Sequence, residues 1–296
     1  MAAATAASLS SEHWFSSLYL SILISFLYPA SLYVWPNALT SNRQEPATIK
    51  RNFISVAVAS AISSQVLLWH LQRVDGPQFV NSLWHYLNWK SYDTSWHFLY
   101  KCLLQPLFYA IILFAVPIYT EIQSFKQSFV DEFHWSSVTF VIKTTCFVAK
   151  QLVELPVIRN LVVAPLTEEF IFRGVILALL LPSWSNTSAI IISSFLFGLM
   201  HSHNLLRRLY HTGKVSNQEV VLSLVQCTYT AFFGAYASIT YIASGHLITP
   251  IALHCFCNFN GLPNFGEIIA NKCHLYLTIL GFSTWLYSLY STCSEF

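Results

Sequence analysis

The chain has 296 residues, of which 55% are hydrophobic and only 9% carry a charge. Soluble domains carry about 25% charged residues, so this composition excludes an ordinary soluble enzyme and is typical of a polytopic membrane protein. The formal net charge of +2 is too small to favour nucleic acid as a partner. The lipid bilayer is instead the expected surrounding.

The sequence contains about eight apolar stretches that are long enough, or nearly so, to cross a membrane, which takes about 20 residues. In chain order they are Trp14–Trp35, Phe53–His70, Phe98–Thr120, Leu161–Leu181, Thr187–His203, Val220–Ala243, Leu247–Leu262 and His274–Tyr290. The expected fold class is therefore all-α, a polytopic transmembrane helical bundle. No linker or repeat divides the sequence, so we expect residues 1–296 to form a single membrane domain.

One more apolar segment, Ser137–Pro156, carries Lys143, Lys150 and Glu154. At about 100° per residue these three side chains share one stripe of a helix, which suits an interfacial or cavity-facing helix better than a span in lipid. When this segment is left out of the spans, the Lys and Arg residues of the loops gather on one side of the membrane. The positive-inside rule makes that side cytosolic.

Three ionisable residues, Glu168, Glu169 and Arg173, lie inside the apolar stretch Leu161–Leu181. Each charge at the centre of a membrane helix costs about 2.5–3.5 kcal/mol, so the stretch is a functional-site hypothesis. Glu169 and Arg173 are spaced i,i+4 and predict an ion pair within the helix, for which a structural role fits better than a direct catalytic one. Glu168 points about 100° away and lacks that partner, so it is the candidate general base.

Two later apolar stretches supply further polar candidates. His201 ends one of them, and His254 and Asn258 are spaced i,i+4 on another, so both can face one cavity. By the charge map, Glu168 and these three residues all fall in the cytosolic half of the membrane. Neutral donors such as His254 and Asn258 are what an oxyanion site needs, although the two side chains could equally pack against each other as structural groups.

Three motifs in this order resemble the type II CAAX prenyl proteases, the Ras-converting endopeptidases. They are Glu-Glu-x-x-x-Arg at 168–173, Phe-x-x-x-His at 197–201 and His-x-x-x-Asn at 254–258. Arg159, Asn160 and Pro165 ahead of the glutamate pair look like the eukaryotic branch. The motif core extends over residues 159–262, and the layout of the spans carries the resemblance over most of the chain.

The resemblance implies an endopeptidase that cuts after the prenylated cysteine of a farnesylated or geranylgeranylated CAAX protein and releases the last three residues. Glu168 and His201 would activate a water molecule, and His254 and Asn258 would stabilise the oxyanion, with Glu169 and Arg173 supporting the site. No metal and no cofactor is implied. The implied location is the endoplasmic reticulum membrane, with the active site toward the cytosol.

Three other functions are compatible with the residues. A zinc-dependent intramembrane protease could ligate its metal through Glu168, His201 and His254, although the sequence has no His-Glu-x-x-His motif. A non-enzymatic membrane scaffold could use the same polar groups for packing. A transporter with an intramembrane carboxylate is the third alternative.

Overall fold

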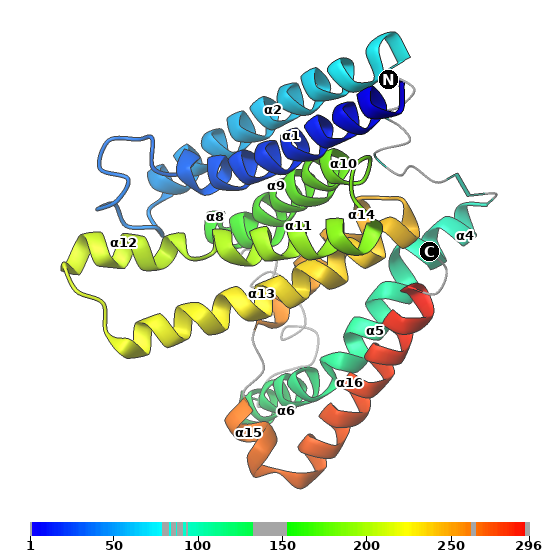
Figure 1. Cartoon of the computed structure of the whole chain (residues 1–296). Helices are drawn as coiled ribbons and strands as arrows, with labels where there is room; N and C mark the ends of the chain where they lie inside the picture. The colour runs from blue at the N-terminus through cyan, green and yellow to red at the C-terminus, as the bar shows by residue number, and fades with distance from the viewer. Residues whose placement is uncertain are drawn as a thin grey trace. The chain divides into compact units, whose positions relative to one another are not determined.

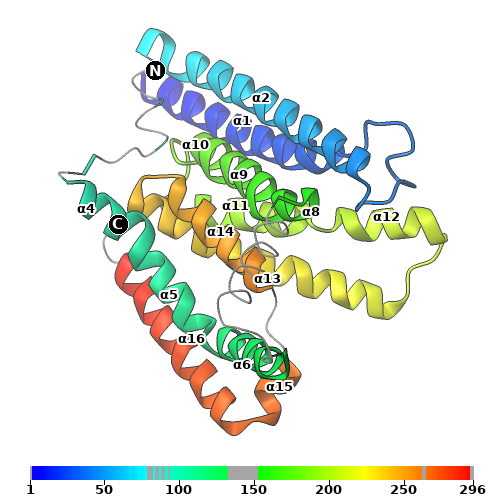
Figure 2. The ribbon, with the colours of Figure 1, turned by 180° about the vertical axis from the view of Figure 1, so that it is seen from behind.

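The computed structural model describes residues 2–78, 83, 87, 91–92, 94–132, 153–261 and 265–293. Every regular element within these ranges is a helix, and none is a strand (Figures 1 and 2). The predicted all-α class is therefore confirmed. Most of the predicted interfacial helix Ser137–Pro156 lies outside the described residues, so that prediction is untested.

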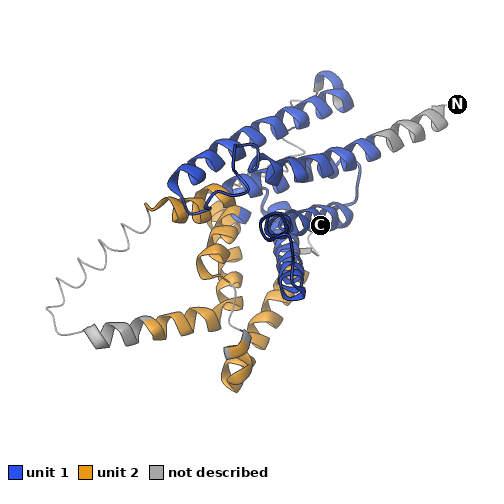
Figure 3. Cartoon of the chain, turned by 90° about the vertical axis from the view of Figure 1, so that its left-hand side faces the viewer, with its two compact units in different colours: residues 1–91, 166–250 blue, residues 92–165, 251–296 orange. Residues whose placement is uncertain are grey.

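The chain packs into two compact units, which Figure 3 distinguishes by colour. The first unit comprises Met1–Ser91 and Leu166–Pro250, and the second comprises Tyr92–Pro165 and Ile251–Phe296. The expectation of a single domain over residues 1–296 stays a prediction.

The first unit is built on two long antiparallel helices that pack against a central helical stretch and a second helix pair. Its elements are α1 (Ala2–Ser31), α2 (Pro46–Asp75), the short η1 (Gly76–Gln78), η4 (Phe170–Ile176), α10 (Leu177–Leu180), α11 (Asn186–Met200), α12 (His203–Thr212) and α13 (Asn217–Ser244). Helix α1 packs on α2, η4, α10 and α11, and α11 lies along α13. Seven of the twelve largest fully buried side chains of the described chain belong to η4 and α10, which therefore form the core of this unit.

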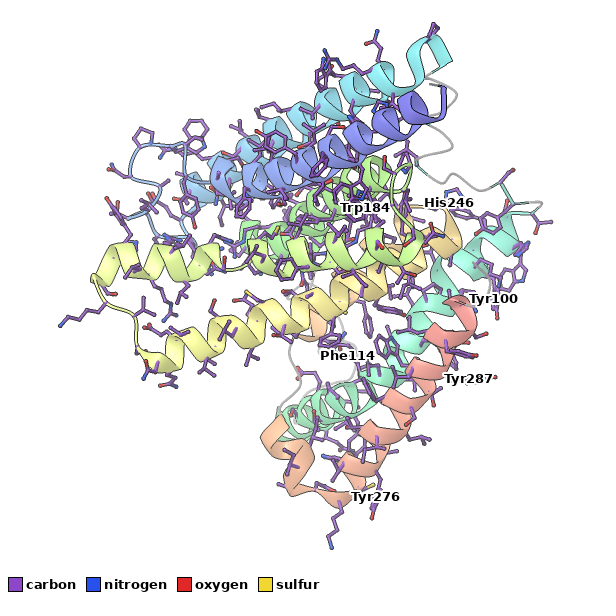
Figure 4. The ribbon with its side chains drawn as sticks, viewed as in Figure 1. Tyr100, Phe114, Trp184, His246, Tyr276 and Tyr287 are labelled. Atoms are coloured by element: carbon purple, nitrogen blue, oxygen red, sulfur yellow. The ribbon has the colours of Figure 1, made fainter. Side chains whose placement is uncertain are left out.

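Local chemistry sets the ends of several of these helices. The Ser185 hydroxyl accepts a hydrogen bond from the Ser188 amide at the start of α11, and Ser216 and Glu219 form a capping box at the start of α13. Helix α13 ends at Ser244 and is capped by Gly245, whose φ of 70° is left-handed and favours glycine. Trp184 (Figure 4) donates to the Ser17 hydroxyl over 3.2 Å and so ties the turn before α11 to α1.

Helices α11 and α13 approach so closely that a side chain would not fit at their crossing. A Cβ atom added at Gly198 would lie 2.4 Å from the Cys227 carbonyl oxygen and 2.8 Å from the Ala231 Cβ. Small residues allow such close approach between helices in membranes, where packing rather than water drives association. Gly198 thus fixes α11, and with it His201 at the end of α11, against α13.

The second unit contains a helix pair in which α16 packs along α5 and α6. Its elements are α4 (Ser95–Leu99), η2 (Tyr100–Leu104), α5 (Gln105–Leu113), α6 (Ala115–Glu132), α8 (Leu155–Ile158), η3 (Arg159–Val163), α15 (Phe265–Ala270) and α16 (Lys272–Cys293). Phe114 (Figure 4) contacts the ring of Phe256 edge to face at 5.6 Å. Tyr100, Tyr276 and Tyr287 in the same figure are exposed, as expected for side chains that face lipid.

Two helices cross the boundary between the units, namely α9 (Ala164–Glu169) and α14 (Ile248–Asn260). Five helices of the described chain are long and apolar enough to span a membrane: His13–Ser31, Pro46–Val74, Ser95–Leu113, Asn186–Thr212 and Asn217–Ser244. They coincide with five of the predicted spans. The other predicted spans also form helices, although α14 has only 13 residues and the stretch around Glu168 carries several charges.

Candidate active site

The helix that carries Glu168 and Glu169 departs from regular α-geometry on both sides of these residues. It is continuous from Leu155 to Leu180, but η3 and η4 are π-helical turns that flank α9. In η3 the amide of Ala164 bonds to the carbonyl of Arg159, five residues back. Such π-turns are rare and occur frequently at functional sites. The periodicity of the sequence had predicted a regular α-helix here.

The predicted ion pair between Glu169 and Arg173 is present and fully buried. Arg173 Nη1 lies 2.8 Å from Glu169 Oε2, and both side chains are 0% exposed. Arg173 also donates from Nη2 to the Gly234 carbonyl over 3.0 Å, so the pair ties η4 to α13. A charge buried this deeply requires its partner, because removal of one member leaves the other uncompensated.

Glu168 lies next to this pair but in a different environment. Its side chain is partly exposed, whereas Glu169 is not exposed at all. Tyr28 of α1 makes a hydrogen-bonding contact with the Glu168 carboxyl group, and its hydroxyl lies 2.9 Å from the Thr167 hydroxyl. Tyr28 therefore holds the candidate base from a neighbouring helix. The sequence analysis missed Tyr28, because nothing in an apolar α1 indicates which residue meets α9.

His201 caps the C-terminal end of α11, and its ring has a defined orientation. Its Nδ1 lies 2.8 Å from the Phe197 carbonyl oxygen. Because a carbonyl can only accept, Nδ1 must carry the hydrogen, which leaves Nε2 of the neutral ring as an acceptor. The Phe197 ring contacts the His201 ring edge to face at 5.1 Å.

Phe197 also connects His201 to the buried ion pair. The Arg173 guanidinium lies 4.6 Å from the centre of the Phe197 ring, in cation–π contact. The Phe172 ring packs edge to face on the same ring at 4.9 Å. Glu169 and Arg173 thus fix Phe197, and Phe197 in turn fixes the imidazole of His201. This is a physical route by which the predicted supporting residues could hold a candidate catalytic one.

Helix α14 carries His254 and Asn258 with the predicted i,i+4 spacing; His254 is buried and Asn258 exposed. Asn258 Nδ2 donates to the Asn160 carbonyl over 2.8 Å. That carbonyl is available because the π-turn directs the Ala164 amide to Arg159 instead. An amide nitrogen carries two hydrogens, so this bond uses half of the donor capacity of Asn258.

Cys255 satisfies the next carbonyl along the same turn. Its thiol donates to Leu161 O over 2.9 Å. In a regular helix the amide of residue 165 would donate to Leu161, but Pro165 has no N–H. Helix α14 therefore satisfies both backbone carbonyls that the π-turn and Pro165 leave open. The sequence analysis gave Cys255 no role, although the position of a proline inside a membrane helix was the available signal.

The structure brings some of the predicted site residues together within one unit. Glu168, Glu169, Arg173 and His201 belong to the first unit, whereas His254 and Asn258 belong to the second. That all of them face a common cavity remains a prediction. Within the described residues, no group of three His, Cys, Asp or Glu side chains is arranged to hold a metal ion.

Comparison with known proteins gives a consistent family. Residues 149–260 match the family described as Type II CAAX prenyl endopeptidase Rce1-like. The chain is 33% identical to CAAX prenyl protease 2 of Homo sapiens over 250 residues, which cover 83% of this chain and 71% of the human protein.

Two further relatives carry the same name. The chain is 27% identical to the probable CAAX prenyl protease 2 of Schizosaccharomyces pombe over 267 residues, 88% of this chain and 87% of that protein. Identity with the Arabidopsis thaliana CAAX prenyl protease 2 is 42% over 108 residues, 36% of this chain and 34% of that protein. No solved structure matches. The match to the human protein extends over most of both sequences, and the family match covers all the motifs from Glu168 to Asn258, so the chain belongs to the type II CAAX prenyl endopeptidase family.

Proposed function

We propose that this protein is a membrane-embedded endopeptidase that removes the last three residues of farnesylated or geranylgeranylated CAAX proteins. Glu168 and His201 activate the attacking water, and His254 and Asn258 stabilise the oxyanion. Glu169 and Arg173 support the site through Phe197. The proposal needs no metal and no cofactor.

The observation that carries this proposal is the difference between two neighbouring glutamates. Glu169 is fully buried and neutralised by Arg173, so its charge is explained by structure alone. Glu168 is partly exposed and is held by Tyr28 from another helix. A carboxylate that is held in position and is accessible to water is suited to general-base catalysis.

The chemistry follows from the groups present. A water molecule gives a proton to the Glu168 carboxylate while its oxygen attacks the carbonyl carbon of the prenylated cysteine. The peptide bond from that carbon to the next residue is the bond that is cleaved. Nε2 of His201 accepts a hydrogen bond from the second O–H of that water and so orients the water. The proton held by Glu168 then passes to the nitrogen of the released tripeptide as the C–N bond breaks. General acid–base catalysis of this kind contributes about 10²–10⁴ in rate.

The proposed roles of His254 and Asn258 depend on their donors. The imidazole and the remaining amide hydrogen of Asn258 would face the oxygen on which negative charge develops. The bond from Asn258 to the Asn160 carbonyl supports this assignment, because it fixes the plane of the amide. The same bond also gives Asn258 a structural task, so its substitution affects both rate and stability.

The substrate explains why the site belongs in a membrane. A prenyl chain anchors the carboxyl terminus of the substrate in the cytosolic leaflet of the bilayer. We therefore propose that the protein resides in the endoplasmic reticulum membrane with its active site toward the cytosol. The concentration of Lys and Arg residues in the loops on that side supports the orientation.

Cleavage of a synthetic farnesylated CAAX peptide by the purified chain tests the proposal. The wild type is expected to release the terminal tripeptide, and the unprenylated peptide serves as the control that the lipid is recognised. Absence of cleavage by a folded, reconstituted wild-type protein would contradict the proposed function.

A further inference from the structure

Helix α12 lies beside the connection from α1 to α2 in the first unit (Figure 1). Residues of both segments line a small cavity. Three arginines, Arg43, Arg51 and Arg207, line it together with Tyr33, Trp35 and His203. None of the described residues that line it is Asp or Glu. The cavity therefore concentrates positive charge.

Two of the arginines lie close to each other. Arg207 donates from Nε to the Leu39 carbonyl over 3.2 Å and from Nη2 to the Ser41 carbonyl. Arg43 is near enough to act electrostatically on Arg207. Burial raises the pKa of the Tyr33 phenol, while Arg43 and then Arg207 lower it, so both cations act on one hydroxyl in the cavity. Such a pair of like charges favours an anion between them.

The donors required by an anion are present. A guanidinium group has five N–H donors, and the two nitrogens of Arg207 used above leave Nη1 with no hydrogen-bond partner within the described part of the chain. Arg43 donates from Nη1 to the Asn204 side chain over 2.7 Å, an exposed contact that holds the arginine beside α12. Arg51 stacks on Trp35 at 5.8 Å from the ring centre.

Two separate segments of the chain each contain a residue that lines the cavity and, a few residues earlier, a residue of the candidate site. Tyr28 of α1 contacts Glu168, and Leu32, which directly follows α1, lines the cavity four residues later, a separation of about 6 Å at the rise of a helix. At the end of α11, His203 of the cavity follows His201 by two residues. An extended tripeptide spans about 10 Å from the scissile bond to its carboxyl terminus.

We propose that this cavity binds the free C-terminal carboxylate of the substrate through Arg43, Arg51 and Arg207. The inference rests on the proposed function and extends it. When the arginines hold the carboxyl terminus, their separation from Glu168 determines that the peptide bond three residues before that terminus lies at the catalytic water. The protein then recognises two groups of the substrate, the prenyl chain in the bilayer and the terminal carboxylate at the cytosolic edge of the membrane.

The size of the cavity favours a carboxylate over a lipid headgroup. Its volume of about 30 Å³ corresponds to roughly two or three water molecules. That room fits a carboxylate group, which has three heavy atoms, better than a phosphate group, which has five; in both cases the rest of the molecule would lie outside the cavity. An anionic lipid is the competing occupant that the experiment must separate.

The test compares two farnesylated CAAX peptides that differ only at the carboxyl terminus, one with a free carboxylate and one with a terminal amide. The full chain is reconstituted in nanodiscs, with and without phosphatidylserine, and kcat/KM is measured for each peptide. The variants are Arg43→Gln and Arg51→Gln. The matched control is Arg208→Gln, because Arg208 is the neighbour of Arg207 on α12 but pairs with Glu219 at 2.6 Å and does not line the cavity.

The wild type and Arg208→Gln are expected to prefer the carboxylate peptide by about tenfold or more. Arg43→Gln and Arg51→Gln are expected to reduce this preference to about twofold or less while cleavage of the amide peptide is retained, which also shows that the variants are folded. Equal wild-type rates on both peptides would overturn the inference while leaving the proposed function intact. Equal loss on both peptides, in parallel with lost dependence on phosphatidylserine, would overturn it in favour of a lipid. No cleavage of either peptide by the wild type would overturn the proposed function itself.

Discussion

Substitution of Glu169, the buried partner of Arg173, should reduce stability, whereas substitution of Glu168 should reduce catalysis. In Glu169→Gln the side chain keeps its shape but loses its charge, which leaves Arg173 fully buried beside Phe197 with no compensating carboxylate of its own. Breaking a buried pair in this way costs about 3–5 kcal/mol. At roughly 2–4 °C per kcal/mol, the melting temperature should fall by about 10 °C.

The matched variant is Glu168→Gln, the same substitution one residue earlier. Because Glu168 is partly exposed and is not the salt-bridge partner of Arg173, its loss should change the melting temperature by only about 2–3 °C, equivalent to roughly 1 kcal/mol. Activity should show the reverse order: Glu168→Gln loses turnover, whereas Glu169→Gln retains measurable turnover at temperatures at which it is folded.

Both quantities can be measured on the same preparations, by thermal unfolding in detergent and by peptide cleavage well below the melting temperature. A double variant, Glu169→Leu with Arg173→Met, removes both charges and should recover much of the lost stability, since apolar replacement of a buried pair is often neutral. Unfolding of Glu169→Gln at the wild-type temperature would refute the reasoning.

Three further substitutions probe other contacts of the site. Tyr28→Phe removes a hydrogen bond to Glu168 without changing the packing of the ring, so kcat should fall about tenfold with an unchanged KM. A change in KM with an unchanged kcat would contradict a role of Tyr28 in positioning the base. Cys255→Ala removes the donor beside Pro165 and should destabilise the protein by about 1 kcal/mol, whereas Cys255→Ser, which keeps a donor, should unfold like the wild type. Gly198→Ala should lower the melting temperature by several degrees because its Cβ would meet a backbone oxygen at 2.4 Å. Gly174→Ala should be tolerated, because its Cβ meets only the side chains of Leu247 at 3.4 Å and Phe170 at 3.5 Å. Similar melting of the two variants would argue against close packing of α11 on α13.

Much of the architecture could be predicted because it depends on local patterns. Apolar length predicts membrane helices, and the i,i+4 spacing of Glu169 and Arg173 predicts their ion pair, since both follow from the geometry of a single helix. The structure confirms the helical class and the ion pair. The different burial of Glu168 and Glu169 likewise follows from their angular separation on one helix, whereas the base role of Glu168 stays a proposal.

The remaining features depend on contacts between segments far apart in the chain. The π-turns on either side of Glu168 shift the hydrogen-bond register, which the spacing of apolar residues does not reveal. Tyr28 reaches Glu168 only because α1 packs against the helical stretch that follows α9. The arginine cavity is assembled from a loop and a helix more than 150 residues apart, and charge counting alone ascribed those arginines to membrane topology.

The most direct test of the central claim is single-turnover cleavage of a farnesylated CAAX peptide by the wild type, Glu168→Gln and His201→Ala. Each variant should retain the wild-type fold and bind the peptide, and each should lose about 10²–10⁴ in rate, as expected when general acid–base catalysis is removed. Wild-type turnover by folded Glu168→Gln would contradict the account, because no other described residue has been assigned the proton of the attacking water.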